Sequence, residues 1–112
     1  MDKLKPFEVG YDKKYTFQMG MISLADEEEI SDRLLASMND GKKDAQKEYE
    51  IYRESLDKFK VGPITALNGK GTKEIVVADE FKDRTAKNER IIRDAYSIFK
   101  SQLAPESRFL SQ

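Results

Sequence analysis

The stretch from Ala45 to Phe59 constrains the fold most, because its apolar residues recur with the period of an α-helix. The repeat alternates between four- and three-residue steps, through Ala45, Tyr49, Tyr52, Leu56 and Phe59. This spacing places side chains on one helical face. At about 100° per residue they fall within a sector of roughly 80°, narrower than the apolar face of an ordinary surface helix. A stripe this narrow predicts packing against a single neighbouring helix, and Ile51 lies well outside it.

That neighbouring helix is predicted in the residues immediately before, beginning at Ser23. Its apolar residues form a complementary stripe: Ile30, Leu34, Leu35 and Met38. Ser23 is expected to cap the helix, with Asp26 three residues later resembling a capping box. The link of residues 39–42, Asn-Asp-Gly-Lys, contains a glycine at which a helix can stop. We therefore expect two helices that fold back on each other between Ser23 and Lys60.

Strands are predicted on both sides of this helical hairpin. Before it, apolar and polar residues alternate, as in half-buried strands, at Phe7, Val9 and Tyr11 and then at Tyr15, Phe17, Met19 and Met21. Residues 12–14 link these strands into a hairpin, and Gly20 indicates a bulge or a close backbone approach. After the helices, residues 64–67 and 73–77 flank an Asn-Gly turn, which is a strong hairpin signal. The nearby Gly-Lys-Gly-Thr sequence lacks the upstream glycine and following helix of a phosphate-binding loop.

A third helix is predicted from about Asp79 to Leu103, where Ala104-Pro105 ends it. Its apolar residues concentrate in the second half: Ile91, Ile92, Ala95, Tyr96, Ile98, Phe99 and Leu103. Residues 82–90 are almost wholly polar, so that part either projects beyond the core or contacts another element. The complete expectation is a single α+β domain over residues 1–104, with a tail at 105–112. It contains two β-hairpins, an αα-hairpin and a long C-terminal helix packed on the sheet.

Composition narrows the classes of function. All 112 residues lack histidine and cysteine, which removes the commonest general base, the thiol nucleophile and the usual metal ligands. Acidic and basic residues number 21 and 20, whereas a nucleic-acid binder has a clear basic excess. Mixed charges over residues 42–60 make a DNA-recognition helix the weaker interpretation of the helical hairpin. Carboxylate pairs could catalyse in a cleft, but none sits inside an apolar run. We therefore expect no enzyme activity, no metal and no cofactor.

The chain also shows no sign of a membrane segment. Its N-terminus lacks the apolar core of a signal peptide, and the longest aliphatic run, Ile75–Ala78, is far too short to span a bilayer. We expect a cytoplasmic protein that binds neither nucleic acid nor membrane nor a small-molecule substrate. Hydrophobic residues make up 38%, below the usual ~45–50%. Because a small domain with few apolar residues is marginal alone, we expect association with other protein subunits, as a homo-oligomer or larger assembly.

Two clusters are candidate interaction sites. The acidic run 26–29 complements the positive end of the first helix; alternatively it forms an acidic docking patch or a hard-cation site. In the polar C-terminal tail, two bulky apolar residues predict docking onto the protein itself or a partner, with an arginine pairing to the acidic run. The predicted interaction residues are Glu27, Glu28, Glu29, Arg108, Phe109 and Leu110.

The order of these elements has a counterpart in a known family. A strand pair precedes the helix-rich region Ser23–Lys60, a short apolar stretch with a Gly turn follows at Val61–Gly69, and the last helix carries Ile-Ile-Arg-Asp-Ala-Tyr at 91–96. Over residues 7–103 this pattern resembles the small tail assembly chaperones and related tail proteins of bacteriophages. The resemblance implies no catalytic residues and a role in holding the tape-measure protein or another tail component, in the host cytoplasm or the virion. The alternative is a small intracellular regulator that binds and inhibits a host or partner protein.

Overall fold

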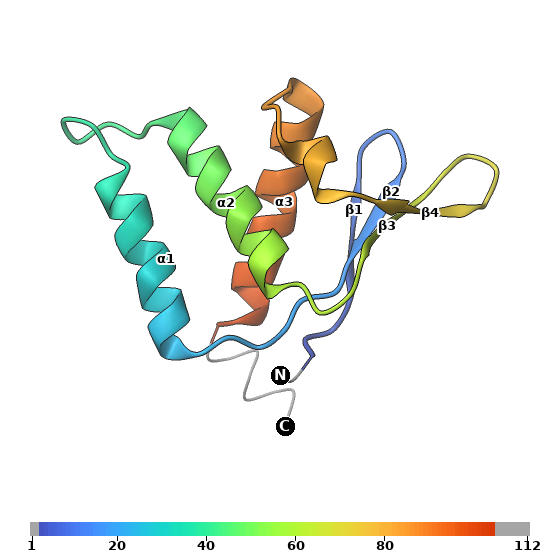
Figure 1. Cartoon of the computed structure of the whole chain (residues 1–112), viewed down its shortest axis with the longest axis horizontal. Coiled ribbons are helices and arrows are strands. Elements are labelled where there is room, and N and C mark those ends of the chain that lie inside the picture. Colours follow the sequence, from blue (N-terminus) through green and yellow to red (C-terminus); the bar gives the residue numbers. More distant parts are fainter. Residues whose placement is uncertain (1–2, 105–112) are drawn as a thin grey trace.

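The computed structural model describes residues 3–104, which form a layer of helices packed on one antiparallel sheet (Figure 1). In chain order the elements are β1 (Phe7–Gly10), β2 (Lys14–Phe17), α1 (Leu24–Ala36), α2 (Ala45–Phe59), β3 (Ile64–Leu67), β4 (Lys73–Val76), the 3-10 helix η1 (Ala78–Phe81) and α3 (Ala86–Gln102). This arrangement confirms the predicted α+β class, with two β-hairpins and helices on the sheet.

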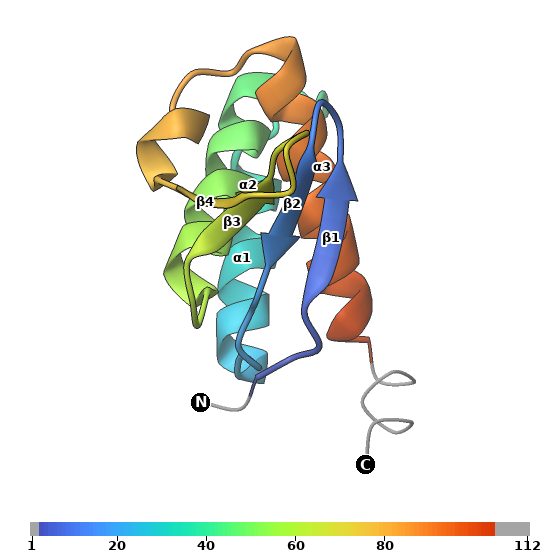
Figure 2. The ribbon, with the colours of Figure 1, turned by 90° about the vertical axis from the view of Figure 1, so that its right-hand side faces the viewer.

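The two hairpins join edge to edge in a four-stranded sheet of order β1-β2-β3-β4. Across the junction, Tyr15 of β2 lies opposite Ala66 of β3. Alternate side chains form a buried face: Phe7, Val9, Tyr15, Phe17, Ile64, Ala66 and Val76. The helices lie behind this face, and the other face of the sheet is uncovered (Figure 2). Burial on one face alone explains why the strands alternate apolar and polar residues.

The first hairpin is shorter than its sequence pattern. β1 ends at Gly10, so Tyr11 lies in the turn and is 48% exposed. After β2 the chain stays close to its neighbours: Gly20 pairs with Lys3 in an isolated bridge, and its N–H donates to the carbonyl of Phe59 at 2.9 Å. This is the close backbone approach that the glycine predicted, and it joins the end of α2 to the segment following β2.

The β3–β4 turn is closed by the side chain of Asn68. Its Oδ1 accepts hydrogen bonds from the backbone N–H groups of Lys70 at 2.9 Å and Thr72 at 3.1 Å. Gly71 has a φ of +78°, a conformation that glycine adopts without steric cost. Lys70 is exposed at the tip of this hairpin. The turn is therefore a hairpin connection, as the Asn-Gly pair predicted.

Caps set the beginnings of α1 and α2. Ser23 Oγ accepts from the N–H of Asp26 at 3.1 Å, and Asp26 Oδ2 accepts from the N–H of Ser23 at 3.4 Å. This reciprocal pair confirms the predicted capping box. Asp44 caps α2 by accepting from the N–H of Lys47 at 3.1 Å. In the link between the helices Asp40 and Gly41 both have positive φ values, 51° and 76°, which reverse the chain direction.

The predicted pairing of α2 with α1 alone was wrong. α2 lies between α1 and α3 (Figure 1). Tyr52, on the predicted stripe, stacks on Tyr96 of α3 with ring centroids 4.3 Å apart. Tyr49 points its hydroxyl to the carbonyl of Phe81, 2.6 Å away. The stripe therefore packs on α3 and η1, and a second flank of α2 meets α1.

That second flank contains Ile51, which was expected to lie outside the contact. Ile51 is only 5% exposed and lines a cavity together with Ser37 and Ala36 at the end of α1. Ser55 is 3% exposed on the same flank, and its hydroxyl donates to the carbonyl of Ile51 at 2.7 Å. α2 contacts two helices, so its buried arc is wider than the apolar stripe in its sequence.

The third helix is not continuous, which corrects the prediction of one helix over 79–103. Phe81 is buried on η1, the chain then turns, and α3 begins after its N-cap Thr85. The Asn88 side chain holds this turn, because its Nδ2 donates to the carbonyls of Glu80 at 2.8 Å and Asp83 at 2.9 Å. The polar residues that were read as the first half of a helix are mostly this turn and the exposed start of α3.

Candidate interaction surface

α1 is the helix least integrated into the core of the described chain. It has a single buried residue, Ile30, whereas α2 and α3 each bury several. One turn later Leu34 is partly buried, and Ser37 just beyond the helix is buried. The spacing of these three residues, four and then three, defines one narrow line of attachment to α2.

Three apolar side chains of this region are exposed. Leu24 and Leu35 are each 67% exposed, and Met38 is 39% exposed. At 100° per residue Leu24 and Leu35 project within about 20° of each other, and Met38 follows just beyond the end of the helix. These three residues form the α1 stripe. The expectation that Leu35 and Met38 pack against α2 was wrong, because Leu35 is exposed on another side of the helix and Met38 is exposed beyond its end.

The groove between α1 and α2 is lined mainly by charged and polar residues, with a few apolar ones between them. Two cavities of about 240 and 320 Å³ lie along it, and Arg33 and Glu54 line both. Arg33 Nη2 and Glu54 Oε2 are 2.6 Å apart across the groove, with side chains 44% and 48% exposed. An ion pair this exposed contributes about 1 kcal/mol or less. α1 is therefore attached by a small apolar contact and a solvated ion pair.

The predicted glutamates at the beginning of α1 point in different directions, because successive helical residues are about 100° apart. Glu29 lines the groove, Glu28 is exposed beside the α1 stripe, and Glu27 is partly buried. Burial raises the pKa of Tyr96 to about 12, with smaller contributions from Tyr52 and from the charge of Glu27. Within residues 3–104 no group of three or more acidic residues is arranged to hold a metal ion. Of the three glutamates, only Glu28 borders the exposed apolar surface.

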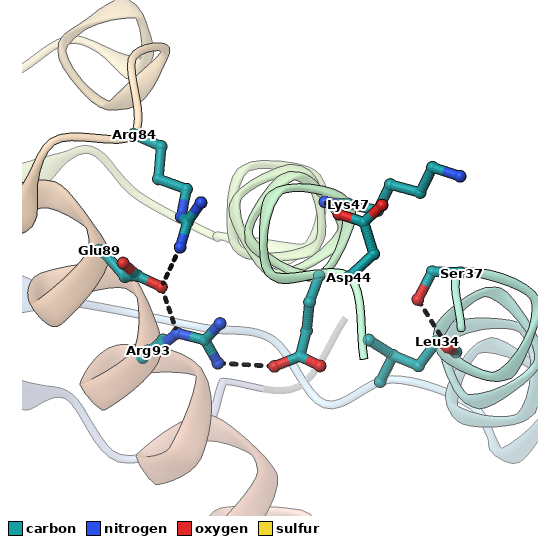
Figure 3. A network of polar contacts seen from close by, with 8 residues as sticks. Leu34, Ser37, Asp44, Lys47, Arg84, Glu89 and Arg93 are labelled. Atoms are coloured by element: carbon teal, nitrogen blue, oxygen red, sulfur yellow. Dashed lines mark hydrogen bonds and ion pairs between the residues drawn. The ribbon is translucent and has the colours of Figure 1, made fainter. Parts of the chain in front are cut away.

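A partly buried polar network, which sequence reasoning missed, fixes α2 against α3 (Figure 3). Glu48 is 7% exposed, and its Oε1 lies 2.6 Å from Arg93 Nη1. Arg93 Nε donates to Glu89 Oε1 at 2.9 Å, and Arg84 reaches the same oxygen at 3.2 Å. Hydrogen bonds from Arg93 and Arg84 lower the pKa of Glu89. The Arg93 guanidinium also lies 5.6 Å from the ring centroid of Tyr52.

The sequence signal that could have identified Glu48 as buried was its position on α2. Once Ile51 is counted with the stripe, the apolar arc widens to about 160° and encloses Glu48 and Ser55, taking 100° per residue. A carboxylate inside such an arc requires a cationic partner. The partner, Arg93, is 45 residues away in the sequence, so only the tertiary structure identifies it.

The other three predicted interaction residues come after the described part of the chain. Arg108, Phe109 and Leu110 are outside the residues that the structure describes. None of the helices in the described part of the chain is long and apolar enough to cross a membrane. The candidate site on the described surface is therefore the α1 stripe with its acidic border.

Comparisons with known proteins found no match. The chain matches no protein-family model, and no curated protein or solved structure is significantly similar to it. Any functional argument therefore depends on the chain's own geometry.

Proposed function

We propose that this protein is a non-enzymatic protein-interaction module that holds a partner protein through the α1 stripe. The observation that carries the proposal is the exposure of Leu24 and Leu35, 67% each, on a helix with one buried residue. Covering a leucine side chain contributes roughly 1.5–3 kcal/mol, so two such residues on one side of a helix are an effective docking surface.

The partner that fits is an amphipathic helix with basic residues along one edge. A helix docks through apolar residues at helical spacing, and α1 offers Leu24 near its beginning and Leu35 near its end, on one side. Along one border of the stripe lie the exposed carboxylates of Glu28 and Asp32. Lysine or arginine beside the apolar face of the partner would complement these charges and set its orientation.

The more specific proposal is a phage tail assembly or virion structural component, in the host cytoplasm or the particle. Its support is the order of elements, a strand pair, a helical hairpin, a second strand pair and a final helix. In that role the partner is another tail protein, and complexes contain several copies. The alternative, a regulator that inhibits a host or partner protein, forms a tight one-to-one complex. Light scattering of the purified complex distinguishes these stoichiometries.

The docking proposal is tested by matched charge substitutions. Leu35→Glu should abolish recovery of the co-purified partner, while Tyr11→Glu, at a 48% exposed position in the β1–β2 turn, should leave recovery unchanged. Crosslinks from the wild-type protein should map to α1 and to an amphipathic basic helix of the partner. Circular dichroism verifies that both variants fold. Equal recovery by both variants, or crosslinks that avoid α1, would overturn the proposal.

A further inference from the structure

We infer that the C-terminal tail, residues 105–112, docks on its own chain as a fifth strand, beside β1 and parallel to it. The surface concerned is separate from the α1 stripe, so the inference goes beyond the proposed function. β1 is an outer strand of the sheet, at the end opposite β4 (Figure 2). Among residues 3–104 no strand pairs with its outer edge. An open edge presents unpaired backbone N–H and C=O groups that another strand can satisfy.

The hydrogen bonds of the first hairpin show which groups of β1 face this edge. The N–H of Tyr11 donates to the carbonyl of Lys13 at 3.1 Å, so these residues form a hydrogen-bonded pair. Bonded and non-bonded pairs alternate in antiparallel sheets, and Val9, two residues earlier, is therefore bonded to β2. Glu8 and Gly10 consequently direct their backbone N–H and C=O groups away from β2, to the open edge.

A cavity of about 270 Å³ lies along the same edge, between β1 and α3. Three residues of the strand and three of the helix line it: Glu8, Val9, Gly10, Asp94, Ser97 and Ile98. Ile98 is apolar but only partly buried. A strand added beside β1 would extend the sheet over this part of α3 and cover the Ile98 side chain.

The tail starts at one end of this cavity. At the end of α3, Gln102 Nε2 donates to the carbonyl of Lys5 at 2.6 Å, just before β1 begins. The Gln102 Oε1 atom is buried and accepts no hydrogen bond within residues 3–104, so it is available to an N–H of the tail. Residues 105–107 can span roughly 10 Å, the usual spacing of packed layers. The residues after them can therefore enter the plane of the sheet and run in the direction of β1.

The backbone of the tail fits this edge when Arg108 lies beside Glu8. Parallel strands bond through alternate residues of each strand. In this register the donors of the tail are the N–H groups of Phe109 and Ser111, which lie opposite the outward carbonyls of β1. Pro105 has no N–H, and it precedes every position at which a donor is required.

The side chains fit the same register. Neighbouring residues of adjacent strands project from the same face of a sheet, so Arg108 lies with Glu8 on the uncovered face, where their opposite charges attract. Phe109 lies with Val9 on the inner face and covers Ile98. A shift of one residue would instead turn Arg108 inward and leave Phe109 on the uncovered face.

The chain's own tail is the occupant because it begins beside the edge that it fits. A tethered segment is present at a high effective concentration, whereas a separate chain also loses translational and rotational freedom on binding. A tail in this position closes the edge of the sheet against other strands.

Hydrogen exchange resolved by residue with NMR tests the added strand in the full chain. The N–H groups of Glu8, Gly10 and Phe109 should be protected. Phe109→Ser should make Glu8 and Gly10 exchange about tenfold faster or more, because each loses a backbone hydrogen bond. Val9, bonded to β2, should stay protected as the internal control, and Leu110→Ser, on the opposite face of the tail, should have the smaller effect. Fast exchange at Glu8 and Gly10 in the wild-type chain would overturn the inference.

Charge reversal tests the register, with exchange of the Gly10 N–H as the measurement. Arg108→Glu places two carboxylates side by side and should remove the protection of Gly10, and adding Glu8→Arg should restore it. Rescue by Asp94→Arg instead would overturn this placement of the tail. Protection that disappears on dilution would overturn it too, because the tail would then lie on a second copy. Leu35→Glu should leave Gly10 protected, so this inference and the α1 docking proposal can fail separately.

Discussion

The Nη1 atom of Arg93 on α3 lies 2.6 Å from Oε1 of Glu48 on α2, and this ion pair joins two parallel helices. One turn further along both helices, Tyr52 stacks on Tyr96, so the contacts follow the same order in each helix. The network and the ring stack together fix the relative position of α2 and α3. α1 is joined to α2 by the solvent-exposed ion pair of Arg33 and Glu54 and buries one residue, Ile30.

Removal of the arginine should destabilise the protein. Arg93→Ala leaves the buried Glu48 carboxylate without its closest cation. We expect the free energy of unfolding to fall by about 2 kcal/mol, less than for a fully buried pair because Arg93 is partly exposed. Arg90→Ala is the control, because its ion pair with Asp94 is 4.0 Å long and its side chain is 66% exposed. That change should cost less than about 0.5 kcal/mol. Urea melts of both variants give the comparison, and equal losses would contradict a structural role for the Arg93 pair.

Ile51 should behave as a core residue. Because Ile51 and Leu56 are 5% and 1% exposed, Ile51→Ala and Leu56→Ala should each lower the free energy of unfolding by about 2–4 kcal/mol. Leu35→Ala, at a 67% exposed position, should change it by no more than about 0.5 kcal/mol. Denaturant titrations measure all three. An Ile51 variant as stable as the Leu35 variant would mean that α1 does not cover α2 in solution.

Asn88 should be required for the turn between η1 and α3. Asn88→Ala removes the donor shared by the carbonyls of Glu80 and Asp83, and leaving such groups unpaired costs about 1–3 kcal/mol. Asn88→Asp keeps the shape but cannot donate when ionised, so it should be at least as destabilising at neutral pH. Hydrogen exchange should accelerate at residues 78–85. Unchanged exchange there in both variants would show that other contacts hold the turn.

Local sequence signals predicted the elements whose stabilising contacts are local. The capping box of Ser23 and Asp26 and the Asn68 turn lie within a few residues of the chain, and both were foreseen. The break before α3 was missed because Phe81 lies fourteen residues, two heptads, before Ala95, so the apolar period continues across the turn. The chain turns there because the Asn88 side chain donates hydrogen bonds to the carbonyls of Glu80 and Asp83. The spacing of apolar residues contains no information on such hydrogen bonds.

The packing partners of α2 and the candidate site depended on tertiary structure. Glu48 and Ser55 are polar in the sequence but buried in the fold. There the Glu48 carboxylate pairs with Arg93, and the Ser55 hydroxyl donates a hydrogen bond to the carbonyl of Ile51. Leu34 and Leu35 are adjacent leucines, and the period alone does not decide which one faces α2. Leu35 and Met38 were therefore predicted as packing residues, and only the fold shows them exposed.

A truncation after Ala104 tests the predicted role of the C-terminal tail. The helices and strands that the structure describes, and a core that extends to Leu103, lie within residues 3–104, so circular dichroism should show that the truncated chain keeps the fold. If Phe109 and Leu110 dock on a partner or a second copy, the truncated chain should lose partner recovery or self-association. Normal assembly would place the interface elsewhere, and unfolding would assign these two residues to the domain's own core.

The last prediction concerns stability at alkaline pH. Burial raises the pKa of Tyr96 to about 12, whereas an unfolded tyrosine titrates near ~10. Below the unfolded pKa both states keep the proton. Above it the unfolded state loses its proton first, so the free energy of unfolding should fall as pH rises from about 10 to about 12.

Three other tyrosines act with the same sign, since burial also raises the pKa values of Tyr15, Tyr49 and Tyr52. Tyr96→Phe keeps a ring to stack on Tyr52 but removes one titrating hydroxyl, so its stability should decline less steeply over that interval. Denaturant melts at a series of pH values measure the slope. Tyrosinate absorbance follows the ionisation directly, because the chain has no tryptophan. Identical slopes for the variant and the wild-type protein would mean that Tyr96 is not buried beside Tyr52 and Glu27 in solution.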